Sequence, residues 1–119
     1  MFDYQKILKI KMDKLAHLVY KISKQLPSSE KYGLISQITR AAVSVILNYI
    51  EGYARIKINV RLNFLEISYG SLKETQYLLY FLYKENMIGK ADYDETFGLS
   101  NEIGAMLWTE IKNISEHIK

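Results

Sequence analysis

Six polar residues recur at helical spacing within an otherwise apolar stretch of this 119-residue chain, and they are its first candidates for chemistry. Successive members stand 3, 4, 4, 3 and 4 residues apart. At about 100° per residue, all six fall within an arc of about 80° on one side of a helix. They form one continuous row, called the polar stripe below: Gln37, Arg40, Ser44, Asn48, Glu51 and Arg55.

The polar stripe has a structural and a chemical interpretation. Glu51 and Arg55 lie four residues apart and can pair. Glu74, on the next helix, can pair with Arg40 or Arg55, and buried pairs of this kind fix helix register. The alternative is a ligand, metal or nucleic-acid site, in which Glu51 and Glu74 hold a divalent cation. Two carboxylates without histidine are a weak signal for such a site. We therefore predict a structural role, Glu74 included, and we expect no metal or other cofactor.

The residue types and their spacing give little support for a catalytic role. His17 and His117 are the only histidines, and neither belongs to a ligand cluster. Ser44 and Ser71 lack a nucleophile-elbow context, and no glycine-rich phosphate loop is present. The chain has no cysteine, which excludes disulfides, thiolate metal sites and cysteine nucleophiles. We predict that the protein is not an enzyme.

The elements that position the polar stripe are helices, because apolar residues recur at helical spacing and no strand alternation is present. Short connections between long helices predict an all-α, antiparallel up-down-up-down four-helix bundle. The length suits a single domain spanning residues 1–119. The predicted helices cover about residues 4–25, 29–54, 59–86 and 92–117.

Proline, serine and glycine positions predict the turns and close contacts. Pro27 ends the first helix, because proline removes an amide donor. Ser28 or Ser29 is then expected to N-cap the second helix, and Gly89 to supply the freedom of the last turn.

Glycines inside the predicted helices indicate tight packing, because glycine there costs about 1 kcal/mol relative to alanine. We expect close approaches at Gly70-Ser71 and at Gly104. Trp108 lies one turn after Gly104 and is expected to fill the neighbouring space in the core.

Charge is distributed unevenly along the chain. The net charge is +3 overall, with +4 in residues 1–31, +2 in residues 32–86 and −3 in residues 87–119. A basic first helix can contact RNA or DNA, and a solvated lysine face is the alternative. The candidate phosphate contacts are Lys6, Lys9, Lys11, Lys14, Lys21, Lys24, Arg55, Lys57 and Arg61.

Two segments are more apolar than a monomeric bundle requires, and we expect them to mediate self-association. They are residues 41–50, where Val43, Ile46, Leu47 and Ile50 adjoin the polar stripe, and residues 77–83, "YLLYFLY". The alternative to self-association is that the tyrosines simply tolerate partial exposure to solvent. No stretch reaches the roughly 18 apolar residues of a membrane span, and the start of the chain lacks a signal-peptide core. We expect a cytoplasmic protein without membrane contact.

The sequence resembles the bacterial four-helix-bundle proteins encoded by 23S ribosomal RNA intervening sequences. Their pattern "FPxxExxGLxxQxRRAAxSIxxNIAEGxxR", followed by "FLxxAxGSxxE", appears here as "LPSSEKYGLISQITRAAVSVILNYIEGYAR" and "FLEISYGSLKE". Thr39 replaces the first arginine of the usual pair, Ile46 a common proline, and Ile50 a small alanine. The matching positions are Pro27, Glu30, Gly33, Leu34, Gln37, Arg40, Ala41, Ala42, Ser44, Asn48, Glu51, Gly52, Arg55, Phe64, Leu65, Gly70, Ser71 and Glu74.

This resemblance implies a bundle that forms rings, with a homopentamer favoured. A related protein, the accessory factor of diversity-generating retroelements, is a basic pentamer that works with a reverse transcriptase and nucleic acid. By analogy we expect a non-enzymatic, homo-oligomeric nucleic-acid-binding or accessory protein. The alternative is a scaffold that binds a protein partner and has no affinity for nucleic acid.

Overall fold

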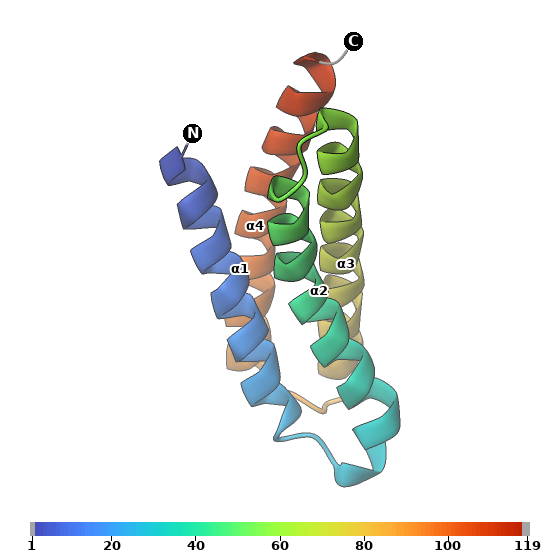
Figure 1. Ribbon diagram of the computed structural model, residues 1–119. Coiled ribbons are helices and arrows are strands. Elements are labelled where there is room, and N and C mark those ends of the chain that lie inside the picture. The colour runs from blue at the N-terminus through green and yellow to red at the C-terminus, as the bar shows by residue number, and fades with distance from the viewer. Residues whose placement is uncertain (1, 118–119) are drawn as a thin grey trace.

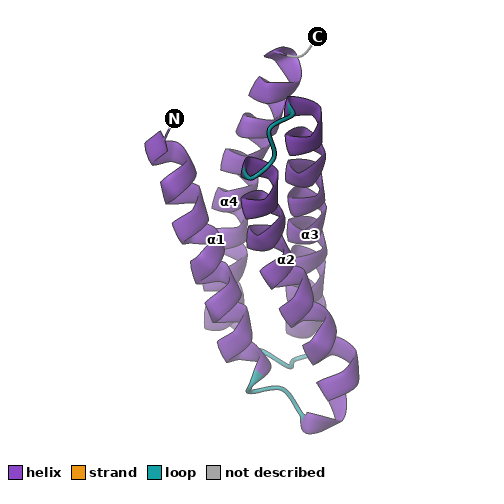
Figure 2. Cartoon of the chain, in the orientation of Figure 1, coloured by secondary structure: helices purple, strands orange, loops and turns teal. Residues whose placement is uncertain are grey.

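The structure is helical and contains four long helices (Figures 1 and 2). It is a computed structural model that describes residues 2–117. Within that range no strand occurs, so the prediction of an all-α protein with four helices is confirmed. The elements are α1 (Phe2–Ser23), a 3₁₀ turn η1 (Ser28–Glu30), a π turn η2 (Lys31–Ile35), α2 (Ser36–Tyr53), α3 (Ile58–Lys84) and α4 (Lys90–His117).

The helices pack side by side into a body of 46 × 25 × 20 Å. Figure 1 shows the chain passing down α1, back along α2, down α3 and back along α4. The most extensive contact joins α2 to α3, and α1 lies against both α2 and α4. Each helix buries residues that recur every three or four positions, which is the spacing of one helix face. On α1 this face consists of Leu8, Met12, Leu15, Val19 and Ile22.

The start of the second helix differs from the prediction. A regular helix was expected from about residue 29 with Ser28 or Ser29 as its N-cap, but the chain instead forms η1 and η2 before α2 begins at Ser36. Neither turn has a side-chain cap, and neither contains a buried residue. Leu34 and Ile35 pack against the core while only half-buried, so few contacts hold these two turns in regular α geometry. The Thr39 hydroxyl donates to the Ile35 carbonyl at 2.7 Å, which ties the π turn to the first turn of α2.

The turn between α3 and α4 depends on Asn86. The prediction that Gly89 supplies its backbone freedom is wrong. Asn86 has a φ of +61°, and it is the one non-glycine residue with positive φ in the described chain. The Met87 amide donates to the Leu82 carbonyl at 2.8 Å, so the chain reverses in a left-handed helix ending. Asparagine tolerates this conformation better than most side chains do. Gly89 has no positive φ.

Of the three expected close contacts, the one at Gly104 is confirmed and those at Gly70 and Trp108 are wrong. Gly104 does approach α3, since a Cβ built there would meet Leu72 at 3.4 Å. Gly70 faces open space, with nothing within 4 Å of such an atom, and Trp108 is 52% exposed rather than in the core. The tightest approach is Gly52, where a Cβ would meet the Arg61 carbonyl oxygen at 3.2 Å. The C-terminal end of α2 can therefore approach α3 closely.

Gly52→Ala is expected to lower the free energy of unfolding by about 1 kcal/mol. Overpacking against backbone costs about 2 kcal/mol, and the better helix propensity of alanine offsets about 1. Gly98→Ala is the matched control, because a Cβ at this position within α4 meets nothing within 4 Å. It should raise stability by about 0.5–1 kcal/mol. Urea unfolding of both variants measures the difference, and equal stability of the two would contradict the close approach.

The segment Ser28–Tyr53 has the length and composition of a membrane-crossing helix. Core helices of water-soluble proteins pass the same test, and this segment also carries Arg40 and Glu51 of the polar stripe. The segment is therefore weak evidence for a membrane span, and the cellular location stays a prediction.

Candidate functional site

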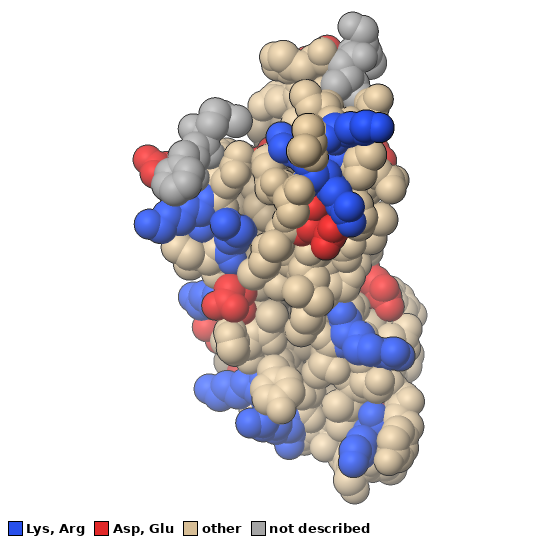
Figure 3. All heavy atoms as spheres, viewed as in Figure 1, with Lys and Arg blue, Asp and Glu red and all other residues tan. Residues whose placement is uncertain are grey.

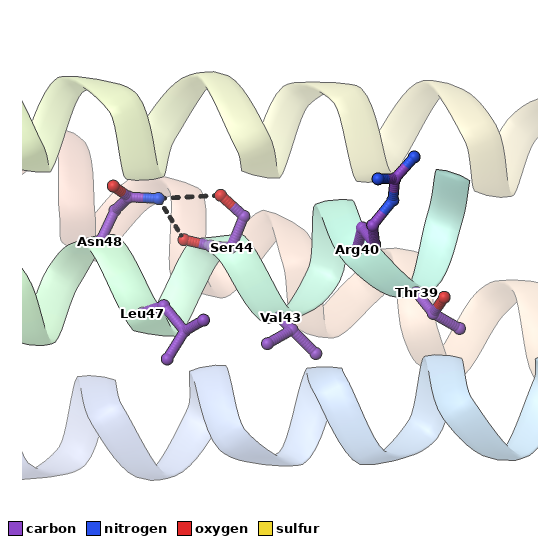
Figure 4. A pocket seen from close by; sticks show the side chains of 6 residues that line it. All are labelled: Thr39, Arg40, Val43, Ser44, Leu47 and Asn48. Carbon is purple, nitrogen blue, oxygen red and sulfur yellow. Dashed lines mark hydrogen bonds between the residues drawn. The ribbon is translucent and has the colours of Figure 1, made fainter. Parts of the chain in front are cut away.

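The centre of the polar stripe ties α2 to α3. The hydroxyl groups of Ser44 and Ser71 are hydrogen-bonded at 2.8 Å. The Asn48 amide donates to both the hydroxyl and the carbonyl oxygen of Ser44, each at 2.8 Å, as Figure 4 shows. One turn away, the Ser68 hydroxyl donates to the Val45 carbonyl at 2.6 Å. These bonds join α2 to α3 and give the hydroxyl groups partners within the protein. The structural role of this part of the stripe stays a prediction.

The end of the stripe forms a surface ion pair. Arg55 pairs with Glu51, as the four-residue spacing predicts. Its guanidinium also lies over the Phe64 ring, 5.1 Å from the centroid. Both charged side chains remain about half exposed, and exposed pairs contribute only about 0–1 kcal/mol to stability.

Glu74 does not form the ion pair that we expected with Arg40 or Arg55. No salt bridge joins these residues in the part of the chain that is described. Because Ser44 lies level with Ser71, Glu74 is about 20 Å along the bundle from Arg55 at 1.5 Å per residue. Glu74 and Arg40 instead border a hollow of about 290 Å³ together with Gln37, Ala41, Ser44 and Ser71.

The same register separates the two carboxylates that were candidate metal ligands. Glu51 lies about 15 Å along the bundle from Glu74, counting 1.5 Å per residue. One divalent cation cannot contact both, because its ligand distances are about 2–2.6 Å. Residues 2–117 contain no group of three or more His, Asp or Glu side chains that could hold a metal.

Beside the stripe, the outer face of α2 is apolar and hollowed. Figure 4 shows Val43 and Leu47 on the side of α2 that faces α1, with Arg40, Ser44 and Asn48 on the α3 side. Leu47 is 57% exposed, Val43 and Ile50 are also exposed, and Ile46 is half-buried. A surface hollow of about 440 Å³ lies along this face, lined by Thr39, Arg40, Val43, Ser44, Leu47 and Asn48.

The basic residues proposed as phosphate contacts fall into two groups. Lys11 pairs with Glu102 at 2.7 Å, Arg55 pairs with Glu51, and Arg61 donates to the carbonyl oxygens of Gly52 and Arg55 at the end of α2. These three have partners within the protein. The others are exposed and form no ion pair among the described residues: Lys6, Lys9, Lys14, Lys21, Lys24 and Lys57.

Most of the unpaired lysines lie on α1 or directly after it. Figure 3 shows Lys and Arg atoms along the α1 side of the molecule, next to a broad uncharged surface over α2. Lys24 also lies over the Tyr20 ring, 4.8 Å from its centroid. One face of the molecule thus carries both the exposed lysines and the exposed apolar residues of α2, called the apolar row below: Val43, Leu47 and Ile50.

A buried carboxylate was missed by the sequence interpretation. Glu110 of α4 is only 3% exposed. The Tyr49 hydroxyl donates to its Oε1 at 2.7 Å, and the Tyr53 hydroxyl donates to its Oε2. Burial, together with these bonds to Glu110, raises the pKa of both tyrosines above the ordinary value. The signal in the sequence was that Glu110 stands between Leu107 and Ile111, on the apolar face of its helix.

Tyr49 and Tyr53 make the free energy of unfolding depend on pH in the alkaline range. Below pH of about 10 they stay protonated in the folded and the unfolded chain, so their contribution is fully present. Above it, only the unfolded chain loses the Tyr49 proton readily, because the folded pKa is raised. The free energy of unfolding should then fall by about 1.4 kcal/mol per pH unit for this residue, until pH reaches the raised value.

Urea unfolding at pH 8, 10 and 11 measures this slope. Tyr49→Phe should remove its part of the decline above pH 10, whereas Tyr32→Phe, at a position that is 90% exposed, should not. Identical slopes for wild type and Tyr49→Phe would show that the Tyr49 proton is not held by the fold.

The fold and the site define a class: a four-helix bundle whose inner polar residues tie its helices together. The family model described as "23S rRNA-intervening sequence protein" matches residues 6–109. This match covers most of the chain, and the protein therefore belongs to the 23S rRNA-intervening sequence protein family.

A solved structure agrees with this assignment. It is a protein with unknown function from the S23 ribosomal protein family of Bacteroides thetaiotaomicron VPI-5482. It is similar with a TM-score of 0.85 and 25% sequence identity, over 92% of this chain and 98% of that chain. Curated proteins include no match to this chain.

Proposed function

We propose that this protein is a non-enzymatic, cytoplasmic bundle subunit that assembles with copies of itself into a ring and binds RNA or DNA. Its four helices form the antiparallel up-down-up-down unit of that ring, and five subunits is the number that the family resemblance favours. The observation that carries the proposal is the face in Figure 3, where unpaired lysines of α1 lie next to the apolar row of α2.

Self-association is supported by apolar surface on two different helices. Val43, Leu47 and Ile50 are exposed on α2, and Tyr77 and Tyr80 are exposed on α3. Exposed apolar patches mark sites of interaction. Two different patches on one subunit suit a head-to-tail contact, and such contacts close into rings when the rotation permits.

Nucleic-acid binding is supported by the unpaired charges. Lys6, Lys9, Lys14 and Lys21 project from α1 into solvent, and residues 6–21 of a helix span roughly 22 Å. Lysines that neutralise phosphates release counterions, so binding of this kind falls steeply with added salt. A ring would repeat the lysine row once per subunit and raise avidity.

Light scattering of the purified protein, with the absorbance ratio at 260 and 280 nm recorded, tests both parts together. We expect a defined oligomer of the 13.9 kDa chain that carries nucleic acid. After removal of that nucleic acid, structured RNA or DNA should shift at about 50 mM salt and be released at higher salt. A monodisperse monomer at micromolar concentration would contradict the ring, and absence of any shift would contradict nucleic-acid binding.

A protein-interaction scaffold is the second candidate function. It is favoured by the aromatic surface of α3 and α4, where Trp108 packs on Tyr69 with ring centroids 5.4 Å apart and stays half exposed. A defined oligomer without affinity for RNA or DNA would favour this function over the first.

A further inference from the structure

We propose that the small cavity beside Glu110 binds the ammonium group of a primary amine. The cavity has a volume of about 90 Å³ and lies between α1, the end of α2 and α4. Its lining residues are Tyr4, Tyr53, Thr109, Glu110, Asn113 and Ile114.

The charge of the cavity comes from Glu110. Two phenol hydroxyls donate to its oxygens, those of Tyr49 and Tyr53. A carboxylate offers about four lone-pair sites, so these two bonds leave capacity unused. In the described chain no Lys, Arg or His lies within salt-bridge distance of this carboxylate.

The guanidinium of Arg61, beside Tyr53, is occupied elsewhere. Arg61 lies over the Tyr53 ring, 4.8 Å from its centroid, and donates to the carbonyl oxygens of Gly52 and Arg55. Burying a carboxylate without a partner cation costs several kcal/mol. A cation bound in the cavity supplies the missing charge.

The rest of the lining suits an ammonium in particular. Thr109 and Asn113 are exposed and stand at the mouth of the cavity, one turn apart on α4. The Thr109 hydroxyl donates to the Ala105 carbonyl at 2.9 Å, and its oxygen keeps the capacity to accept. Together with Asn113 and Glu110, Thr109 gives the lining three residues that can accept from the three donors of an ammonium group.

Size and aromatic walls narrow the choice of ligand. Water occupies about 30 Å³ in the liquid, so the cavity admits a head group of a few heavy atoms. The rings of Tyr4 and Tyr53 line it and attract a cation placed against their faces. A quaternary ammonium has no N–H donors for the acceptors, and a neutral alcohol has no charge for Glu110.

The test compares n-butylammonium with n-butanol and tetramethylammonium at constant ionic strength. Thermal unfolding and amide chemical shifts of the wild-type protein should show saturable binding of n-butylammonium alone, at the residues that line the cavity. Glu110→Gln should weaken binding at least tenfold, whereas Glu95→Gln, which removes an exposed carboxylate of α4, should leave it unchanged. Non-saturable effects, equal effects of butanol, or unchanged binding by Glu110→Gln would each overturn the proposal and leave water as the occupant.

A second variant covers the case in which Glu110→Gln fails to fold. Asn113→Leu replaces an exposed residue at the cavity mouth, so it should fold normally and still block the amine. Unchanged amine binding by this variant would contradict the site. Comparing spermidine with Nα-acetyl-lysinamide then distinguishes a free polyamine from a lysine side chain as the source of the ammonium. The assay needs neither nucleic acid nor assembly, so its failure would leave the proposed function intact.

Discussion

A triple variant with Lys14, Lys21 and Lys24 replaced by glutamine is expected to bind nucleic acid two to three orders of magnitude more weakly than wild type, at about 0.1 M salt. Each lysine that neutralises a phosphate adds about 0.9 to the slope of log affinity against log salt concentration. Three such lysines therefore account for a factor of about 500 at that salt. All three are exposed and without an ion pair in the structure described.

The matched control removes the same net charge from other faces. Lys73, Lys84 and Lys112, which lie on α3 and α4, are exposed and become glutamine together. Gel shifts or fluorescence anisotropy over a salt series should show a slope lower by about 3 for the α1 variant and a nearly unchanged slope for the control. Equal loss in both variants would mean that binding follows net charge and that α1 is not the interface.

Leu47→Asp is expected to convert the assembled protein into a monomer. Leu47 lies in the middle of the exposed row on α2, between Val43 and Ile50. Burying one leucine side chain completely in an interface between subunits contributes about 1.5–3 kcal/mol to the free energy of association. An aspartate there forfeits this gain and must also lose its hydration, which costs several kcal/mol more. Because the side chain is exposed in the single subunit, the fold itself should be retained.

Light scattering and far-ultraviolet circular dichroism check this expectation. The variant should scatter as a 13.9 kDa chain with unchanged helix content. Ile56→Asp is the control, since Ile56 lies between α2 and α3, is 95% exposed and stands apart from the row. If Leu47→Asp keeps the wild-type mass, the outer face of α2 is not the contact between subunits.

Within one helix, sequence spacing predicted the site well. The 3,4 periodicity placed the polar stripe on one side of α2, and the four-residue interval paired Glu51 with Arg55. These features depend only on the geometry of a single helix, which is the same for every helix and so follows from residue spacing alone.

Between helices, the same reasoning failed for Glu74 and for Trp108. Partners for Glu74 depend on the register of α3 against α2, in which Ser44 lies level with Ser71 and Gly52 lies close to Arg61. Trp108 lies one turn after Gly104, but a helix turns about 400° in four residues and Trp108 lies at the edge of the buried face. Its indole therefore packs on the outside, against Tyr69.

The sequence by itself determined the four helices and the polar stripe, because these follow from local periodicity along one segment. Only the tertiary structure decided how α2 begins, that Asn86 takes the left-handed turn, and that Glu74 stays apart from Arg55. It also decided that Glu110 meets Tyr49 and Tyr53 from another helix. These outcomes depend on how side chains from distant segments pack against one another, and no spacing within a single segment encodes that packing.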